Sequence, residues 1–501
     1  MPQPPPQQAK DGPILAGFHK ATRKTAMIQH PTSEPMSAVD RAWLDMDDPC
    51  NPMVISAIFQ LEGPVDAANL QKVMVERLLR YPRFSQRVDR SEGAPRWVTD
   101  RNLDYRNHVH VRRLPHGAND RELRKAISAE VSRELDHKHP LWRLLLYPCP
   151  SGPVTVLFRA HHALADGIAL VTLLIDSTDS GFQRAPDPGA VTATPTMRPG
   201  PLGGLIDTLD LVNGGLIKLR SMVRSRGGRV QLLRQFNRGR DAVNAVRGVL
   251  ALPENNPPAL CKPLSGHRGV AWVDDIPLEP IRRQAKALGV RVNDLLMTAL
   301  AGAFSRQLHH SSAELSEEQN LRISVPVNLR SGKGRSLGNH FGLVLLDLPV
   351  GVNSQQTRLR LVAERMTALK ESPQARATML GLAAAGHLPV PLERKLVDRI
   401  GAKSVAVVSS LPGPRRHVRI GGARMRNLVF WPPQSGGIGM GLSFFSYAGQ
   451  LSFGVSADLA LLPSPRGLLE ALRSELEELQ TLVPAPEAPE QTATEPLPDV
   501  A

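Results

Sequence analysis

The sequence predicts an α/β (α+β) protein built from two similar halves, and three observations support this. Candidate strands and amphipathic helices are mixed along the chain, which favours layers of helix packed on sheet. A segment of different composition, residues 186–263, divides the patterned region, and the elements on its two sides follow a similar order. The length of 501 residues also exceeds that of one ordinary domain.

The first half, residues 36–185, begins its pattern near Met36. Asp66 is suited to an N-cap, and Leu70, Val73 and Leu78 follow it at helical spacing. The predicted strands are residues 54–61, 144–147 and 154–158, and the predicted helices are residues 66–79, 121–135 and 167–176. The last helix is short and apolar and follows the third strand closely.

Residues 186–263 form the predicted connection between the halves. Prolines crowd both of its ends, and Asp241 is the only acidic residue between Arg220 and Arg247, where arginines stand among Leu, Val and Ile. This composition predicts basic amphipathic helices that attach to an anionic membrane surface or a lipid inclusion. A solvated basic face is the simpler alternative.

The second half, residues 264–482, repeats the mixture of strands and helices. The predicted strands are residues 270–273, 322–327 and 343–348 and a hairpin of residues 442–447 and 451–455, turned by Ala448 and Gly449. The predicted helices are residues 280–288, 293–308 and 467–479. The terminal segments, residues 1–35 and 483–501, are rich in Pro and polar residues and are predicted to be disordered.

The net charge of the chain limits the classes of binding partner to be considered. A net charge of +14 favours acidic ones: nucleic acid, anionic lipid or phosphate-bearing substrates. Nucleic acid is disfavoured, because no binding module is recognisable and aromatic residues make up only 4% of the chain. No secretory signal and no run of 18 apolar residues is found, so we expect a cytoplasmic protein without a transmembrane helix, peripherally associated with membrane or lipid droplets.

Several kinds of catalytic site are excluded by their missing motifs. The chain contains no G-x-S-x-G nucleophile elbow, no phosphate-binding loop and no H-E-x-x-H metal motif. Its three cysteines are far apart, which argues against a zinc knuckle or a redox dithiol. Few catalytic patterns remain, and the strongest is His161-His162-Ala163-Leu164-Ala165-Asp166-Gly167.

The histidine pair stands between the strand 154–158 and the helix that begins at Gly167. Adjacent side chains at a strand end point to opposite sides, so one imidazole can face a cleft while the other packs inward. A neutral imidazole can take a proton from an alcohol. Asp166 is placed to cap the helix, and Gly167 allows close approach. No third ligand stands at a characteristic spacing, so no metal site is predicted.

This pattern resembles the signature of the chloramphenicol acetyltransferase superfamily of acyltransferases. Other segments resemble the bacterial wax ester synthase/acyl-CoA:diacylglycerol acyltransferase family within it. They are Met36-Ser37-Ala38-Val39-Asp40 with Trp43-Leu44, Pro140-Leu141-Trp142, Val292-Asn293-Asp294, Pro326-Val327-Asn328-Leu329-Arg330, Gly338-Asn339-His340-Phe341-Gly342 and Ser409-Ser410-Leu411-Pro412-Gly413-Pro414. Ser410 departs from the family, which usually has Asn there.

The resemblance implies two chloramphenicol-acetyltransferase-like sandwich domains with the active site in a channel between them. It further implies an O-acyltransferase that moves a fatty acyl group from acyl-CoA to a fatty alcohol or diacylglycerol. His162 would be the general base, with His161 and Asp166 as supports, and Gly167 would lie close to the substrate. No cofactor is expected, because acyl-CoA is a substrate.

Three further residues are candidates for contact with substrate. Trp142 is explained more simply as a buried residue at the start of a strand, although it could also shape the acyl tunnel. Asn293 and Asp294 are sufficiently explained by capping a helix, and the resemblance implies that they hold the two halves around the site.

Two other functions compete with this one. A condensation domain that takes its acyl group from a carrier shares the histidine motif, but no carrier or adenylation domain is visible. A non-catalytic coat protein of lipid inclusions would use the basic connection and would not need the motif.

Overall fold

The computed structural model describes residues 33–184, 247–310, 315–329 and 339–482, apart from short gaps at 64, 92, 150–151, 249–250, 254–256, 258–259, 373 and 387. The tail 483–501, most of the tail 1–35 and most of the connection 186–263 lie outside the described residues. One correction concerns the N-terminal tail. Ser33–Pro35 form strand β1 and pair with Arg96–Val98, so the ordered part begins earlier than Met36.

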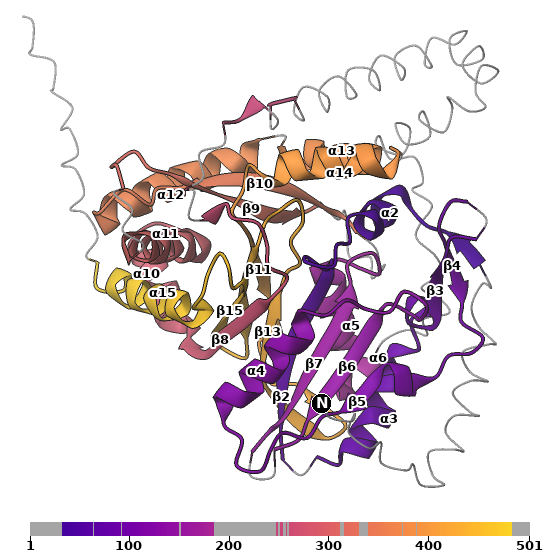
Figure 1. Ribbon diagram of the computed structural model, residues 1–501. Helices are drawn as coiled ribbons and strands as arrows, with labels where there is room; N and C mark the ends of the chain where they lie inside the picture. Colours follow the sequence, from indigo (N-terminus) through magenta and orange to yellow (C-terminus); the bar gives the residue numbers. More distant parts are fainter. Residues whose placement is uncertain are drawn as a thin grey trace, which may run out of the picture.

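The first large sheet has six strands in the order β12-β13-β2-β7-β6-β5 (Figure 1). Four of them come from the first half: β2 (Val54–Glu62), β5 (Val109–Val111), β6 (Trp142–Tyr147) and β7 (Val154–His161). The other two, β12 (Arg419–Ile420) and β13 (Ala423–Trp431), come from the second half, and β13 pairs antiparallel with β2. The first sheet therefore depends on both halves of the chain.

The second large sheet has the order β10-β9-β11-β14-β15-β8. Its strands are β8 (Arg268–Pro277), β9 (Leu321–Asn328), β10 (Phe341–Leu348), β11 (Ala406–Pro412), β14 (Met440–Tyr447) and β15 (Gln450–Asp458). The hairpin β14–β15 is the predicted one, and Ala448 and Gly449 have φ values of 48° and 82°. These positive values are the left-handed backbone that a tight hairpin turn requires.

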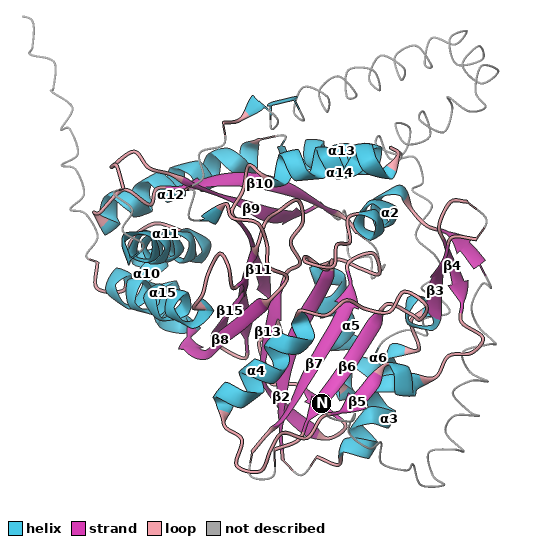
Figure 2. Cartoon of the chain, viewed as in Figure 1, coloured by secondary structure: helices cyan, strands magenta, loops and turns pink. Residues whose placement is uncertain are grey.

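Helices cover both sheets (Figure 2). The first half contains α2 (Ala38–Asp45), α3 (Ala67–Leu78), α4 (Asp120–Val131), α5 (Gly167–Asp176) and α6 (Asp179–Arg184). The second contains α10 (Leu278–Ala287), α11 (Val292–His310), α12 (Gln355–Glu371), α13 (Gln374–Ala385), α14 (Val390–Gly401) and α15 (Pro465–Leu479). A small sheet, β1-β4-β3, with β3 (Gln86–Asp89) and β4 (Arg96–Thr99), and two 3-10 helices, Pro82–Ser85 and Tyr105–Asn107, complete the described elements.

Every predicted strand and helix that falls on described residues is present, with ends shifted by a few residues. Asp66 caps α3 by accepting hydrogen bonds from the backbone N–H groups of Ala68 and Asn69. Helix α5 has the predicted bounds. The predicted strand 154–158 continues to His161, which makes that histidine the last residue of β7. Not predicted were the helices α2, α6, α12, α13 and α14 and the strands β1, β3, β4, β5, β11, β12 and β13.

A shared core joins the two halves. Ile58 and Leu157 of the first half pack with Trp272 and Trp431 of the second in one buried cluster. Next to it, the hydroxyl of Ser128 on α4 accepts a hydrogen bond from the Val270 N–H on β8. The mixed α/β architecture of the prediction is confirmed, with the two sheets meeting through this core.

Among the described helices, none is by itself long and apolar enough to cross a membrane. In the part of the chain that the structure describes, α10 and α11 taken together reach the required length and composition, and their axes differ by 100°.

Candidate active site

A pocket lies where the two halves meet, and His162 is in its wall. About 790 Å³ of space between atoms lies within it, including the part that is open to solvent. The first half contributes Trp43, Ile55, His162, Asp166, Gly167 and Ile168; the second contributes residues of β9, β10, β11 and β13 and of the loop after β13, among them Phe341, Ser409 and Pro432. The pocket is mostly apolar, with a few polar groups near the imidazole.

His162 is held firmly and is neutral. Its backbone N–H donates to the carbonyl of Met53 at 2.7 Å. Its ring stacks on Trp43, with 4.2 Å between ring centroids, and tilts against Phe341 at 5.4 Å. Burial lowers the pKa of His162 to about 4, although the carboxylate of Asp166 opposes this shift. At neutral pH the imidazole can therefore accept a proton.

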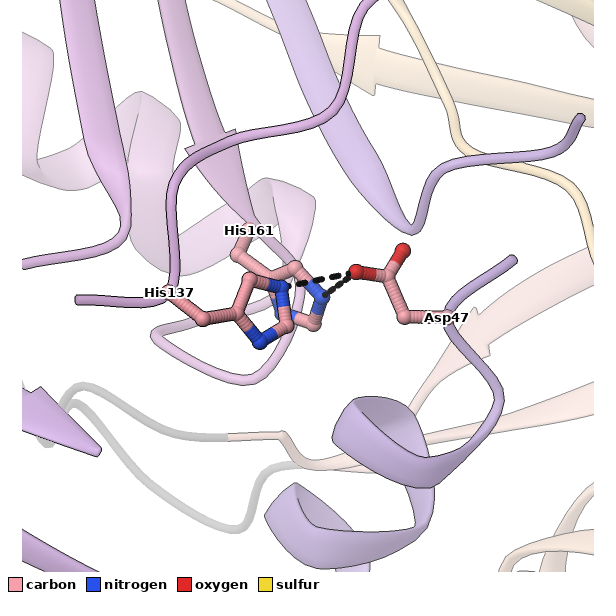
Figure 3. A group of neighbouring side chains, drawn as sticks. All are labelled: Asp47, His137 and His161. Atoms are coloured by element: carbon pink, nitrogen blue, oxygen red, sulfur yellow. Dashed lines mark hydrogen bonds and ion pairs between the residues drawn. The ribbon is translucent and has the colours of Figure 1, made fainter. Parts of the chain in front are cut away.

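His161 points the other way, as alternation at a strand end predicts. Its side chain is fully buried, and its Nδ1 accepts a hydrogen bond from the Ala163 N–H at 3.1 Å. Its Nε2 lies 3.4 Å from Oδ2 of Asp47, which also contacts Nε2 of His137 at 3.0 Å (Figure 3). These three side chains form a cluster behind the pocket wall, and neither Asp47 nor His137 was predicted. Spacing could not reveal them, because they are 90 residues apart.

Asp166 joins the two halves. Oδ1 accepts a hydrogen bond from the Ala169 N–H at 2.9 Å, which caps α5 as predicted. Oδ2 accepts one from the His340 N–H of the second half at 3.0 Å. Gly167 follows on the pocket wall, where a Cβ atom would come within 3.4 Å of Leu411. The motif's last two residues therefore bring α5 and the segment before β10 together at the pocket.

Asn339 is a buried residue that the sequence analysis quoted but did not place in the site. Its Nδ2 donates to the carbonyl of His162 at 2.9 Å and to Oδ1 of Asp40 at 2.8 Å. Burial raises the pKa of the Asp40 carboxyl, and the nearby Arg83 and Asn339 oppose this. Asn339 thus connects the second half with α2 and with the backbone of His162.

The other three predicted residues lie outside the wall of this pocket. Trp142 is buried, and its Nε1 donates to the carbonyl of Phe84 at 2.9 Å. Asn293 accepts a hydrogen bond from the hydroxyl of Ser410 at 3.0 Å. Asp294 accepts one from the Arg291 N–H at 2.8 Å near the start of α11. Their contact with substrate stays a prediction, and Ser410, which departs from the resembled motif, lies against one of them.

A second hollow adjoins the first and is more apolar. It shares Trp43, Ser324, Phe341, Leu343, Ser435 and Ile438 with the first pocket. It extends between α2, β10, α13 and α14, and about 910 Å³ of space between atoms lies within it, including the part that is open to solvent. Together the two hollows give the neutral imidazole a largely apolar neighbourhood.

The comparisons with known proteins agree with this arrangement. Residues 36–296 match the family described as the wax ester synthase/diacylglycerol acyltransferase catalytic domain, and residues 337–480 match the WS/DGAT C-terminal domain. A probable diacylglycerol O-acyltransferase from Mycobacterium tuberculosis is 28% identical over 421 residues, covering 81% of this chain and 86% of the relative.

Solved structures share the fold. The wax ester synthase/diacylglycerol acyltransferase from Marinobacter aquaeolei superposes with a TM-score of 0.63 at 23% identity, covering 89% of this chain and 99% of that one. The first condensation domain of the CDA synthetase superposes with a TM-score of 0.54 at 16% identity, covering 90% and 96%. The two-domain fold implied by the resemblance is confirmed.

Proposed function

Because this chain belongs to the wax ester synthase/diacylglycerol acyltransferase family, and is therefore an O-acyltransferase, we propose that it transfers a fatty acyl group from acyl-CoA to a fatty alcohol or diacylglycerol with His162 as general base. The observation that carries the proposal is the neutral, buried imidazole in a pocket lined by both halves. The apolar hollow beside it suits the aliphatic chains of such substrates.

The reaction needs one group that first accepts and then returns a proton, and it needs no covalent enzyme intermediate. His162 takes the proton from the hydroxyl group while the oxygen attacks the thioester carbonyl. The tetrahedral intermediate then collapses, the carbon–sulfur bond breaks, and the thiolate leaves and takes the proton from the imidazolium. We assign the base to Nε2, because Nδ1 of His162 is buried and the acceptor hydroxyl cannot reach it. Positioning and proton removal are sufficient for an activated thioester.

The neighbouring residues act as supports in this proposal. Asp166 holds the start of α5 to the second half, and His161 fills the space behind the pocket wall. Gly167 leaves room beside the imidazole for the acceptor. Any substrate contact of Trp142, Asn293 or Asp294 would be indirect or would involve a surface other than the first pocket.

The test is an acyl-transfer assay on the purified protein. Labelled palmitoyl-CoA is incubated with hexadecanol or dioleoylglycerol, and the labelled ester and free CoA are measured. Because general-base catalysis contributes about 10²–10⁴-fold, His162→Ala should reduce kcat by at least about 100-fold while the unfolding midpoint changes little.

The control is His116→Ala, which removes an exposed histidine from a loop of the first half. It should keep wild-type activity with both acceptors. A purified His162→Ala protein that retained full activity would exclude His162 as the base. Ester formation only from a carrier-bound acyl group would favour the condensation-type alternative, and absence of transfer to any acceptor would favour a non-catalytic coat.

We further propose that the enzyme works at an anionic lipid surface. The support is the net charge of +14 together with the arginines between Arg220 and Arg247. If the acceptor is presented in phosphatidylcholine vesicles, adding phosphatidylglycerol should increase both sedimentation of the protein with the vesicles and the initial rate. A rate and a bound fraction independent of phosphatidylglycerol would contradict this.

A further inference from the structure

Asp47 lies in the turn between α2 and β2, behind the wall that carries His162. Its Oδ1 accepts a hydrogen bond from the Met53 N–H at 2.7 Å. Its Oδ2 accepts one from Nε2 of His137 at 3.0 Å and lies 3.4 Å from Nε2 of His161. The side chain is 9% exposed, so this carboxylate is largely withdrawn from water while it contacts three groups. Figure 3 shows both imidazoles directed at the same oxygen.

The contact with His161 determines where the proton of that imidazole resides. The Ala163 N–H donates to Nδ1 of His161, so Nδ1 must carry the lone pair and Nε2 must carry the hydrogen. Nε2 is buried and has no acceptor at ordinary hydrogen-bond geometry among the described residues. Asp47 is therefore the group that offsets the burial of this N–H, and it favours the tautomer that keeps the turn at Ala163 closed.

Asp47 also reaches the second histidine through Met53. The carbonyl of Met53 accepts the backbone N–H of His162 at 2.7 Å, while the N–H of the same residue donates to Asp47. One carboxylate oxygen thus contacts the side chain of His161, and the other is one residue removed from the backbone of His162. Both routes converge on the short segment that sets the direction of the His162 imidazole.

From this geometry we propose that Asp47 is a positioning residue for acyl transfer, which fixes the tautomer of His161 and the backbone of His162 and thereby aims the base. The inference rests on the proposed function of His162. Among the described residues, Asp47 lines neither of the two hollows, and it acts through the two histidines. Burial raises the pKa of the Asp47 carboxyl, but the interactions with the His137 and His161 imidazoles outweigh this, and the net pKa lies below its ordinary value. The group is charged throughout the working pH range.

The cluster of Asp47, His137 and His161 could alternatively bind a divalent metal ion. The ligand atoms of Asp47, His137 and His161 lie within 4.8 Å of one another. A metal on Nε2 of His161 would, however, move the imidazole proton to Nδ1, where it would face the Ala163 N–H. Two donors would then oppose each other in a buried place. The hydrogen-bonded network is therefore favoured, and metal binding is an outcome that the test must detect.

The experiment replaces Asp47 with Asn. The amide oxygen can still accept the Met53 N–H, but an N–H group now faces the two histidines where the carboxylate accepted. We expect kcat to fall about 10–100-fold with KM within twofold of wild type, because substrate binding is untouched and the base is misaligned. In ¹⁵N-histidine NMR spectra, the Nε2–H tautomer of His161, assigned with His161→Gln, should lose population.

The matched control is Asp48→Asn. Asp48 is the adjacent acid; its carboxylate accepts a hydrogen bond from the Cys50 N–H, and among the described residues it contacts neither histidine. The substitution should leave kcat, KM and the tautomer unchanged. An Asp47→Asn protein with wild-type kcat and an altered tautomer, or one with a defect in KM alone, would overturn the positioning role. Zn²⁺ could instead bind stoichiometrically to wild type and not to Asp47→Asn, and increase the kcat of the wild-type protein. The cluster would then be a metal site.

These outcomes are distinct from failure of the proposed function. If wild type transfers acyl groups and His162→Ala does not, a normal Asp47→Asn protein refutes only the inference. If wild type fails to acylate any acceptor, the proposed function fails, and a changed His161 tautomer in Asp47→Asn would then describe a structural network only.

Discussion

The junction of β7 and α5 and the start of α11 look alike in sequence but differ in structure. Each places an aspartate at the beginning of a helix, Asp166 in one case and Asp294 in the other. Asp166 accepts one hydrogen bond from its own helix and a second from His340 in the other half of the chain. The carboxylate of Asp294 accepts its hydrogen bond from Arg291, only three residues away.

The two aspartates differ in how far along the chain their hydrogen-bond partners lie. A helix cap explains both aspartates locally, but only Asp166 uses its second oxygen to connect the two halves at the pocket. Asp294 has a buried oxygen without a hydrogen-bond partner among the described residues, and burial raises the pKa of its carboxyl. Capping chemistry alone therefore does not distinguish an aspartate that organises a site from one that begins a helix.

The largest effect expected from this comparison is that of Asp166→Ala. It removes an N-cap, which costs about 1 kcal/mol, and leaves the His340 N–H without its acceptor, which costs about 1–3 kcal/mol. The free energy of unfolding, measured in urea, should fall by about 2–4 kcal/mol. Acyl transfer should fall at least about tenfold, because Asn339 and Phe341 move with His340.

Asp294→Ala provides the comparison for that variant. Among the described residues its carboxylate accepts a hydrogen bond from the nearby Arg291 N–H alone, so we expect a loss of about 1 kcal/mol in unfolding free energy. Equal losses of stability and activity in the two variants would break the distinction between the two helix starts.

The acid limb of the pH–rate profile should follow His162 and not Asp294. His162 must be neutral to accept a proton, and burial lowers its pKa to about 4. The kcat/KM value should therefore stay constant as the pH falls through 6.5 and decline only near pH 4 to 5. Asp294→Asn should leave this limb unchanged. A limb near pH 6.5, or one displaced by Asp294→Asn, would show that a different group controls the rate.

The smallest effect concerns Ser410, which stands where the resembled family usually has Asn. Its hydroxyl donates to Asn293 at 3.0 Å in a partly exposed position. Ser410→Ala should reduce the unfolding free energy by about 0.5–1 kcal/mol and change kcat less than twofold. Ser410→Asn is the matched variant; a change in acyl-chain preference with either protein would assign a role in specificity to this contact.

The sequence predicted the elements whose periodicity is local. Strand β2, helix α5 and the β14–β15 hairpin follow from patterns within ten residues. Helices α12 to α14 were missed, although α14 lies on the second hollow. Strand β13 was missed because it pairs in the sheet of the other half, so its pattern says little about its partners.

The residues of the site also fall into those that the sequence identified and those that it did not. His161, His162, Asp166 and Gly167 are continuous in sequence, and the structure brings them to one junction. Trp43, Asn339 and Phe341 were visible only as parts of motifs that carried the resemblance. Asp47 and His137 had no signal, because no regular spacing relates them to His161. What remained hidden was the set of contacts made by tertiary folding.

The position of β13 has a consequence for folding during synthesis on the ribosome. Strand β2 borders on β13, and two of their facing residues, Gln60 and Asn427, are 367 residues apart. At a synthesis rate of about 5–20 residues per second, β13 is completed roughly 20–70 s after β2, and until then the edge of β2 that pairs with it has no partner. During that time β2 presents an unpaired edge that is prone to aggregation. A chain cut within the connection should therefore leave an N-terminal fragment that needs a chaperone, and yield of soluble enzyme should improve when translation is slowed or chaperones are abundant.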